Sequence, residues 1–232
     1  MKLLQDKVAL VTGGSRGIGA SIVSRFAEAG AQVAFTYRSS KEKAEALASE
    51  LAAAHGVTVK AYQSDAASFS AAEELVKAVV EDFGGLDVLV NNAGYGLMGA
   101  FETLDEAQIL RQFDTNVFGL METCRAVLPY FRERKSGVLV NVASMVGRVP
   151  LPLYSVYNAS KWAVEGFTEG LVYELAPLGI GVKIIEPGAV NTEFFGRSAD
   201  RKNQTGIESY AEYSQAQLGV MDKTGPGGSR PE

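Results

Sequence analysis

Short runs of apolar, mostly β-branched residues recur along the chain as far as residue 185. Most of them are continuous rather than alternating with polar residues, which is typical of strands buried on both faces of a parallel sheet. The predicted strands are Val8–Val11, Val33–Tyr37, Val57–Tyr62, Val88–Val90, Val138–Val142 and Val182–Ile185.

The stretches between these runs have the spacing of amphipathic helices. In Lys41–Ala54, for example, Ala44, Leu47 and Leu51 fall on one stripe. The predicted helices are Ala20–Ala29, Lys41–Ala54, Ser70–Phe83, Glu106–Arg134 in two pieces, and Val156–Leu175. Regular alternation of strand and helix predicts an α/β fold, namely a doubly wound parallel sheet of six strands with right-handed crossovers.

The alternating pattern ends after Phe195. Gly196–Gln204 is polar, Ile207, Tyr210, Ser214 and Leu218 fit one face of a short helix, and Thr224–Glu232 is rich in Gly and Pro without a strand pattern. No linker precedes residue 196, so we predict a single domain over residues 1–232. Its core would cover residues 5–195 and its irregular end residues 221–232.

Composition removes several classes of protein. Apolar residues make up 47% of the chain and charged residues 21%, which excludes wholesale disorder. The formal net charge of −5 argues against nucleic acid or an anionic membrane as the main partner. Cys124 and His55 are the single residues of their types, which excludes a zinc site built from Cys and His. With no signal peptide and no long apolar run, we expect a soluble cytoplasmic protein without a bound metal.

A glycine cluster follows the first predicted strand directly. The segment Thr12-Gly13-Gly14-Ser15-Arg16-Gly17-Ile18-Gly19 leads into a helical pattern. Glycines allow positive φ and close approach of a pyrophosphate, and a helix N-terminus offers it free N–H groups. The alternative is a strand-to-helix turn that binds nothing, but the strand–turn–helix context favours a dinucleotide.

The second predicted strand indicates which dinucleotide. NAD is usually held by a carboxylate at the end of this strand, on its ribose 2′-hydroxyl. Here the strand ends Tyr37-Arg38-Ser39-Ser40, with Arg38 at the expected place and Arg16 inside the glycine turn. Two guanidinium groups suit a 2′-phosphate, so NADP(H) is preferred over NAD(H), unless either arginine is only a solvated surface residue.

Tyr157 and Lys161 carry the candidate chemistry. They are four residues apart and share one face of the predicted helix. A nearby ammonium and a nicotinamide cation would together lower the pKa of a phenol toward neutrality, where it can act as general acid or base. Ser144 lies just past the C-terminal end of the strand Val138–Val142, where ligands of parallel sheets bind. Taken alone, Tyr157 and Lys161 would be read as an exposed pair and Ser144 as a turn residue.

These motifs together resemble the short-chain dehydrogenase/reductase family. The resemblance covers about residues 5–195 and rests on Thr12–Gly19, Asn91-Asn92-Ala93-Gly94, Asn116, Ser144, Tyr157 and Lys161, in order and at fitting intervals. It implies a Rossmann fold. Residues 1–94 look more like bacterial 3-oxoacyl-(acyl-carrier-protein) reductases, whereas residues 95–195 look like a broader group of ketone, steroid and lipid-type reductases.

The resemblance also implies residue roles. Tyr157 would protonate the substrate oxygen, Ser144 would orient that oxygen, and Lys161 would hold the nicotinamide ribose and lower the pKa of Tyr157. Asn116 would position a water that relays protons to Lys161, while Asn91 more simply pins neighbouring strands. The expected cofactor contacts are Gly13, Ser15, Arg16, Ile18, Gly19, Arg38, Asp65, Ala66, Asn92, Tyr157, Lys161, Pro187, Val190 and Thr192.

The C-terminal end departs from the family pattern, which usually continues into another helix and a seventh edge strand. We therefore expect a homodimer more than the tetramer that this strand often builds. An apolar lid over residues 191–220 would contain Phe194, Phe195, Ile207, Tyr210 and Leu218, although these residues equally fit plain packing or an oligomer contact.

Three functions stay open. The first is an NADP(H)-dependent carbonyl reductase acting on an apolar small molecule, or oxidising the matching alcohol. The second is reduction of a 3-oxoacyl thioester on acyl carrier protein. The third is a non-catalytic NADP-binding sensor or scaffold, because a fold does not fix a function.

Overall fold

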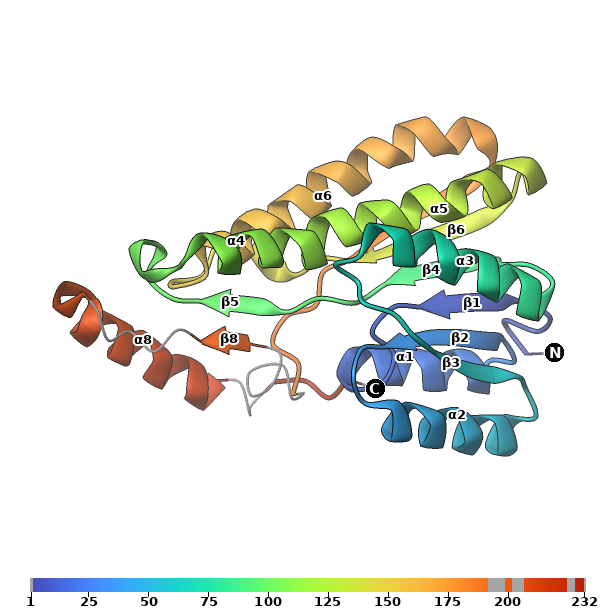
Figure 1. Ribbon diagram of the computed structural model, residues 1–232, viewed down its shortest axis with the longest axis horizontal. Coiled ribbons are helices and arrows are strands. Elements are labelled where there is room, and N and C mark those ends of the chain that lie inside the picture. The colour runs from blue at the N-terminus through green and yellow to red at the C-terminus, as the bar shows by residue number, and fades with distance from the viewer. Residues whose placement is uncertain (1, 192–198, 202–206, 225–227, 232) are drawn as a thin grey trace.

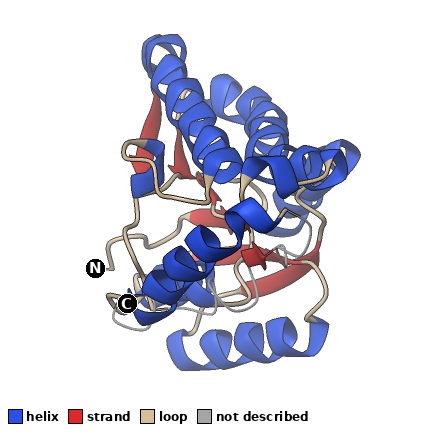
Figure 2. Cartoon of the chain, turned by 90° about the vertical axis from the view of Figure 1, so that its left-hand side faces the viewer, coloured by secondary structure: helices blue, strands red, loops and turns tan. Residues whose placement is uncertain are grey.

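The computed structural model describes residues 2–191, 199–201, 207–224 and 228–231. Its main sheet has six parallel strands in the order β3-β2-β1-β4-β6-β7. The chain winds outward from β1 in one direction and then returns to wind in the other, so the predicted doubly wound sheet is confirmed. Figure 2 shows these strands between layers of helices.

The predicted strands and helices agree with the structure to within about two residues at most ends. The strands are β1 (Val8–Val11), β2 (Gln32–Tyr37), β3 (Val59–Gln63), β4 (Val88–Asn91), β6 (Gly137–Val142) and β7 (Ile180–Ile185). The helices between them are α1 (Gly17–Glu28), α2 (Lys41–His55), α3 (Phe69–Phe83), α4 (Glu106–Phe113), α5 (Gly119–Arg134) and α6 (Ser155–Leu175). The start of α1 lies three residues earlier than predicted, because the helix begins inside the glycine cluster.

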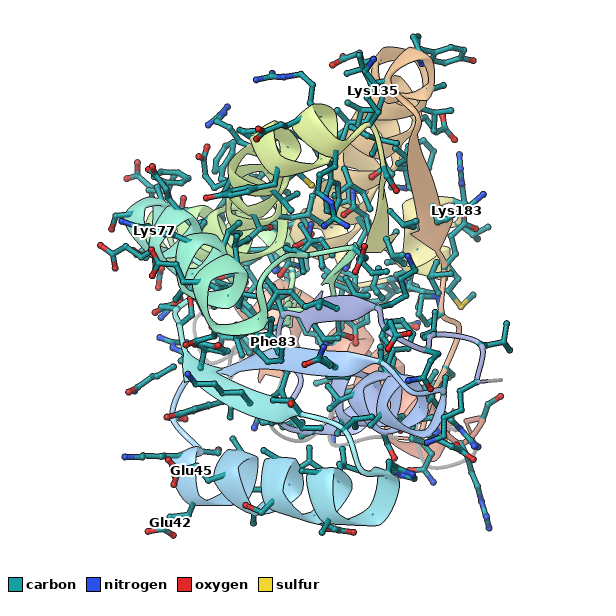
Figure 3. All side chains as sticks on the ribbon, turned by 90° about the vertical axis from the view of Figure 1, so that its right-hand side faces the viewer. Glu42, Glu45, Lys77, Phe83, Lys135 and Lys183 are labelled. Atoms are coloured by element: carbon teal, nitrogen blue, oxygen red, sulfur yellow. The ribbon has the colours of Figure 1, made fainter. Side chains whose placement is uncertain are left out.

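Each face of the sheet has its own hydrophobic cluster. α1 and α2 cover one face, where Val23, Ala27 and Leu51 pack against Val33 and Phe35. α3, α5 and α6 cover the other face (Figure 1), where their apolar stripes meet the central strands. The outer sides of the helices are charged, as Glu42, Glu45 and Lys77 illustrate (Figure 3). This two-sided burial explains why the strands are continuous apolar runs.

The segment Glu106–Arg134 is not cleanly split into two helices. A five-residue π-helix, Asp114–Phe118, joins α4 to α5 without a break. π-Helical turns are rare and are frequently found at functional sites. Asn116, a predicted site residue, lies in the middle of this turn.

Two short strands were missed in the sequence. β5 (Gly96–Met98) and β8 (Ala199–Arg201) form a separate parallel pair (Figure 1). β8 falls inside Gly196–Gln204, which looked irregular because its residues are polar. Three-residue strands carry too little pattern to be recognised, and their pairing is set by tertiary contacts.

The C-terminal helix and the chain end also differ from the prediction. α8 (Ala211–Thr224) begins after Ile207 and Tyr210, so only Ser214 and Leu218 of the predicted apolar face lie on it. Beyond it, Ser229 forms a bridge with Val190, and its backbone exchanges hydrogen bonds with Ala189 and Asn191. The expected irregular end is therefore paired locally with the loop after β7. In the described part of the chain, no helix is long and apolar enough to cross a membrane.

Candidate active site

The glycine turn between β1 and α1 is shaped by tight backbone contacts. Gly13 has a φ of +66°, a conformation that residues with a side chain rarely adopt. A Cβ on Gly19 would lie 2.2 Å from the carbonyl oxygen of Gly13, and a Cβ on Gly14 would lie 2.5 Å from Cβ of Phe35. The turn therefore requires glycine at these positions, and it leaves the first N–H groups of α1 facing the cleft beside it.

Asn92 and Thr12 hold this turn from the side of β4. The Asn92 amide donates to the carbonyl oxygens of Thr12 and Gly13, at 2.9 and 3.2 Å. The Thr12 hydroxyl accepts hydrogen bonds from the backbone N–H groups of Asn92 and Ala93. The expected role of Asn91 as a strand pin is confirmed, because its amide donates to Asn141 of the adjacent strand at 3.0 Å.

The ends of β2 and β3 form the outer part of the cleft. Arg38 follows β2, and its Nε lies 3.5 Å from a carboxylate oxygen of Asp65, which follows β3. Both side chains are largely exposed, so this ion pair is screened by water and holds Arg38 weakly. Arg16, the residue before α1, is exposed beside the same cleft. Both guanidinium groups are therefore exposed beside the cleft, and among the described residues only the weak ion pair of Arg38 competes with an anion there.

Ser144, Tyr157 and Lys161 come together at the C-terminal end of β6. Ser144 follows the strand and begins a short turn, in which its hydroxyl accepts from the N–H of Val146. Tyr157 and Lys161 lie in the first two turns of α6, and both are buried. Lys161 Nζ donates to the carbonyl oxygen of Val142 at 2.9 Å and lies 5.9 Å from the centre of the Tyr157 ring.

Burial dominates the ionisation of this pair. It raises the pKa of Tyr157 above its ordinary value, and a hydrogen bond with Ser144 acts in the opposite direction. Burial also lowers the pKa of Lys161 to about 8, opposed by the carboxylate of Glu165. From the sequence, we expect the Lys161 ammonium and a nicotinamide cation together to lower the pKa of Tyr157. This lowering stays a prediction for the site with its cofactor bound.

The π-helix presents Asn116 to the segment after β4. Its side-chain carbonyl accepts from the N–H of Tyr95 at 3.1 Å, and its amide donates to the Tyr95 carbonyl and to Ser160. A Cβ on Gly94 would lie 3.1 Å from the Asn116 oxygen and 3.9 Å from Lys161 Nζ. Asn116 thus fixes the backbone beside Lys161, and its oxygen retains a second lone pair that a water molecule can use.

One cleft of about 550 Å³ joins these parts. Among the predicted site residues, it is lined by Gly13, Ser15, Arg16, Ile18, Gly19, Arg38, Asp65, Ala66, Asn92, Ser144, Tyr157, Lys161, Pro187 and Val190. Thr192, Phe194 and Phe195 lie outside the described residues. The glycine turn, the two arginines and the buried phenol suit the phosphate, adenosine and nicotinamide parts of a dinucleotide in that order.

Sequence reasoning missed a group of residues at the mouth of the cleft. Arg111 of α4 lies 3.7 Å from a carboxylate oxygen of Asp200 on β8, and the Gln108 amide donates to the same oxygen. Tyr95 lines the cleft beside them. No local motif marks this cluster, because Asp200 lies some 90 residues after Gln108 and Arg111 in the sequence. These residues meet only when β8 pairs with β5.

Tyr154 also belongs to the site. Its ring centre lies 5.4 Å from that of Tyr157, and it lines the cleft. It joins Met98, Val146 and Leu218 in a small apolar cluster around Tyr157. Of this cluster, Val146 and Tyr154 line the cleft beside Tyr157 and give it an apolar surface there.

Comparison with known proteins agrees with this geometry. The model of the short chain dehydrogenase family matches residues 7–203. A 3-ketodihydrosphingosine reductase of Bacteroides thetaiotaomicron is 32% identical over 98% of this chain and 80% of its own length. A 3-oxoacyl-(acyl-carrier-protein) reductase of Staphylococcus epidermidis is 38% identical over 84% of this chain and 80% of its own.

A solved relative carries the dinucleotide. The crystal structure of a short chain dehydrogenase from Burkholderia cenocepacia in complex with NADP is 35% identical, with a TM-score of 0.77 over 97% of this chain and 93% of that one. The chain belongs to the short-chain dehydrogenase family. It is thus an oxidoreductase of a family that binds a nicotinamide cofactor and interconverts carbonyl and alcohol groups of small molecules.

Proposed function

We propose that the chain is an NADPH-dependent reductase of apolar ketones, with Tyr157 as general acid. The observation that carries the proposal is the joining of two sets of residues in one cleft. The glycine turn lies along it, and Ser144, Tyr157 and Lys161 border it as well. A sensor that only binds NADP would need the first set and not the second.

The preference for NADPH over NADH rests on Arg16 and Arg38. Both line the cleft beside the glycine turn, where the adenosine ribose would lie. Among the described residues, the end of β2 offers no carboxylate that would hold a free 2′-hydroxyl in place of Arg38. Asp65 comes from β3, and its weak ion pair with Arg38 would give way to a 2′-phosphate carrying more charge.

Each residue around the reacting atoms would have a separate role. Bound NADPH would supply a hydride to the carbonyl carbon. Tyr157, kept protonated by its burial, would donate its proton to the carbonyl oxygen, and Ser144 would hold that oxygen by a hydrogen bond. Lys161 would bind the ribose and stabilise the phenolate as the proton leaves. Asn116 holds the backbone next to Lys161 and would place a water to return the proton.

The substrate would lie between Tyr157 and the segment after β7. Val146, Leu151 and Tyr154 line the cleft there and offer it an apolar wall. Residues 1–232 would form one domain, and the described part of the predicted lid, residues 199–201 and 207–220, would lie near the substrate. Both relatives are named after a substrate with a ketone at carbon 3. One name gives a 3-keto compound and the other a 3-oxoacyl chain, and both agree with an apolar substrate.

A second candidate is reduction of a 3-oxoacyl group carried by acyl carrier protein. The 38% identity to the Staphylococcus epidermidis reductase over 84% of this chain favours it. Such a substrate would need a carrier-protein contact at the mouth of the cleft. Arg111, an exposed cation that lines the cleft and is paired with Asp200, would be one such contact.

The test is NADPH consumption, followed by near-ultraviolet absorbance, with an acetoacetyl thioester and with a long-chain ketone that has no thioester. Turnover of the ketone supports the first proposal, and turnover of the thioester alone supports the second. Tight NADPH binding with no turnover of either would overturn both and leave the sensor. Tyr157→Phe is the matched control, because it should abolish turnover and spare NADPH binding.

A further inference from the structure

An ion cluster lies directly behind the site, around Arg148. This residue ends the short turn that Ser144 begins. Its guanidinium lies 3.0 Å from Glu165 and 2.6 Å from Glu169, both on α6, and 3.1 Å from Glu186, which follows β7. Arg148 therefore joins the three segments that carry the Ser144 turn, the Tyr157 helix and the loop of Pro187.

Glu165 is the unusual member of this cluster. Its side chain is 4% exposed, whereas those of Glu169 and Glu186 are 53% and 38% exposed. Among the described residues, Arg148 is its one ion-pair partner. A buried carboxylate that has lost most of its water is costly unless a cation compensates it. Burial raises the pKa of Glu165, and the guanidinium of Arg148 opposes this shift and favours the ionised carboxylate.

Glu165 follows Lys161 by one helical turn. Side chains on a helix lean toward its N-terminus, so Glu165 leans back over the turn that carries Lys161. A contact confirms this direction. A Cβ on Gly147 would lie 3.1 Å from Glu165 Oε1 and 3.2 Å from the backbone oxygen of Lys161. The carboxylate and the base of the lysine thus share one neighbour.

The buried ammonium of Lys161 needs a nearby negative charge to compensate it. Its buried ammonium donates to one carbonyl oxygen, that of Val142, which does not compensate a full charge. The other charged or titratable groups that face it are Tyr157 and Glu165, on its own helix. Tyr157 is neutral, because burial raises its pKa. The single anion acting on Lys161 among the described residues is then Glu165.

We propose that Glu165, kept ionised by Arg148, is a positioning residue that holds Lys161 in its protonated form at neutral pH. The proposal rests on the catalytic role given to Lys161 and deepens it. The groups that face Glu165 are Arg148, Glu186, Glu169 and Lys161, so two of them favour its ionised form and two oppose it. Burial is the largest influence and raises the pKa of Glu165 above its ordinary value, and Arg148 is the strongest influence in the opposite direction.

The direct test measures Lys161 without any cofactor. In protein labelled with ¹³C-lysine, the ε-carbon signal that disappears in Lys161→Arg is titrated by NMR. In Glu165→Gln we expect the pKa of Lys161 to fall below about 8, because the carboxylate that opposes the effect of burial is lost. An unchanged titration in a folded Glu165→Gln protein overturns the proposal and assigns Glu165 a purely structural role.

Glu169→Gln is the matched control. It makes the same change on the same helix and also removes a carboxylate from Arg148, but it lies a turn farther from Lys161 and is exposed. We expect its Lys161 titration to equal that of the wild type. An equal shift in both variants would show a general field effect of α6 and would overturn the specific role of Glu165.

Arg148→Met gives a second route if Glu165→Gln does not fold. Without Arg148, burial should protonate Glu165, so the Lys161 pKa should fall as in Glu165→Gln, and the double variant should add nothing further. A full additional shift in the double variant would contradict the chain of action from Arg148 through Glu165.

The pH profile of turnover then connects the inference to catalysis. For Glu165→Gln, the pH above which NADPH-dependent reduction declines should move down, whereas a structural defect would scale the whole curve. An NMR shift in a protein that reduces no carbonyl would support the coupling and overturn the proposed function. Carbonyl reduction without the NMR shift would support the proposed function and overturn the coupling of Glu165 to Lys161.

Discussion

The molecule holds two regions that are built in different ways. The cofactor region, residues 7–94, is made of β1 to β4 and their helices, and the centre of its binding surface is the glycine turn. The reaction region, residues 95–191 together with the described segments after them, presents side chains from β6, α4, α6, β8 and α8. In the first, shape comes from glycines packed against their neighbours. In the second, it comes from polar and ionic contacts between segments far apart in the chain.

This difference separates what each region tolerates. A backbone surface has no spare room, since added carbons at Gly14 and Gly19 would overlap atoms that cannot move cheaply. A side-chain surface can change one member at a time, as long as buried charges stay compensated. We therefore expect small substitutions in the glycine turn to weaken cofactor binding strongly, and substitutions in the reaction region to alter rate, pH dependence or substrate choice.

The largest expected effect is a loss of turnover in the reaction region that leaves NADPH binding in the cofactor region intact. Tyr157→Phe removes the proton donor, so kcat should fall by about 10³-fold or more, with the dissociation constant of NADPH changed less than about threefold. Stopped-flow reduction and fluorescence titration of NADPH measure the two quantities. Comparable loss of both would mean that Tyr157 acts as a structural part of the cleft.

The second effect belongs to the cofactor region. In Gly19→Ala, the new carbon would lie 2.2 Å from the Gly13 oxygen, so the turn must open, and NADPH should bind about 100-fold more weakly, a loss of about 2.7 kcal/mol. Gly166→Ala in α6 is the control, since nothing lies within 4 Å of its added carbon. It should bind NADPH normally and raise the free energy of unfolding by about 0.5–1 kcal/mol. Equal NADPH affinity in both proteins would remove the glycine turn from the binding site.

The third effect tests the choice of dinucleotide. Arg38→Gln removes one charge beside Asp65 and should raise the KM for NADPH by about tenfold while leaving the KM for NADH within about twofold, because a hydrogen bond to a charged group contributes about 1.5–3 kcal/mol. Steady-state kinetics with both cofactors checks it. A parallel rise for both would indicate a damaged cleft rather than lost recognition of the 2′-phosphate.

The smallest effect concerns the strand over the cleft. Asp200→Asn keeps an acceptor for Gln108 and removes the ion pair with Arg111, whose atoms are 3.7 Å apart at a half-exposed position. Exposed pairs contribute about 0.2–1 kcal/mol, so the KM for the ketone should rise by about two- to fivefold with kcat nearly unchanged. A large loss of kcat would mean that β8 takes part in the chemistry.

The two regions also differ in how far the sequence predicts them. The glycine turn, the strand ends and the Tyr157–Lys161 pair are local patterns, and each is where the pattern placed it. The β5–β8 pair, the Arg111–Asp200 contact and the Arg148 cluster depend on tertiary packing, so no short motif marks them. Glu165 was the exception, since its position one turn after Lys161 is a local signal that the sequence reading overlooked.

The π-helix at Asp114–Phe118 has a consequence for chain length. A π-helical turn contains one residue more than an α-helical turn. Each residue of an α-helix advances the chain around the helix axis by about 100°. Removing a single residue here would turn α5 relative to α4 by that angle and swing Thr123 and Cys124 out of the core. Relatives of this chain should therefore keep the same spacing between Gln112 and Thr123, whatever residues fill it.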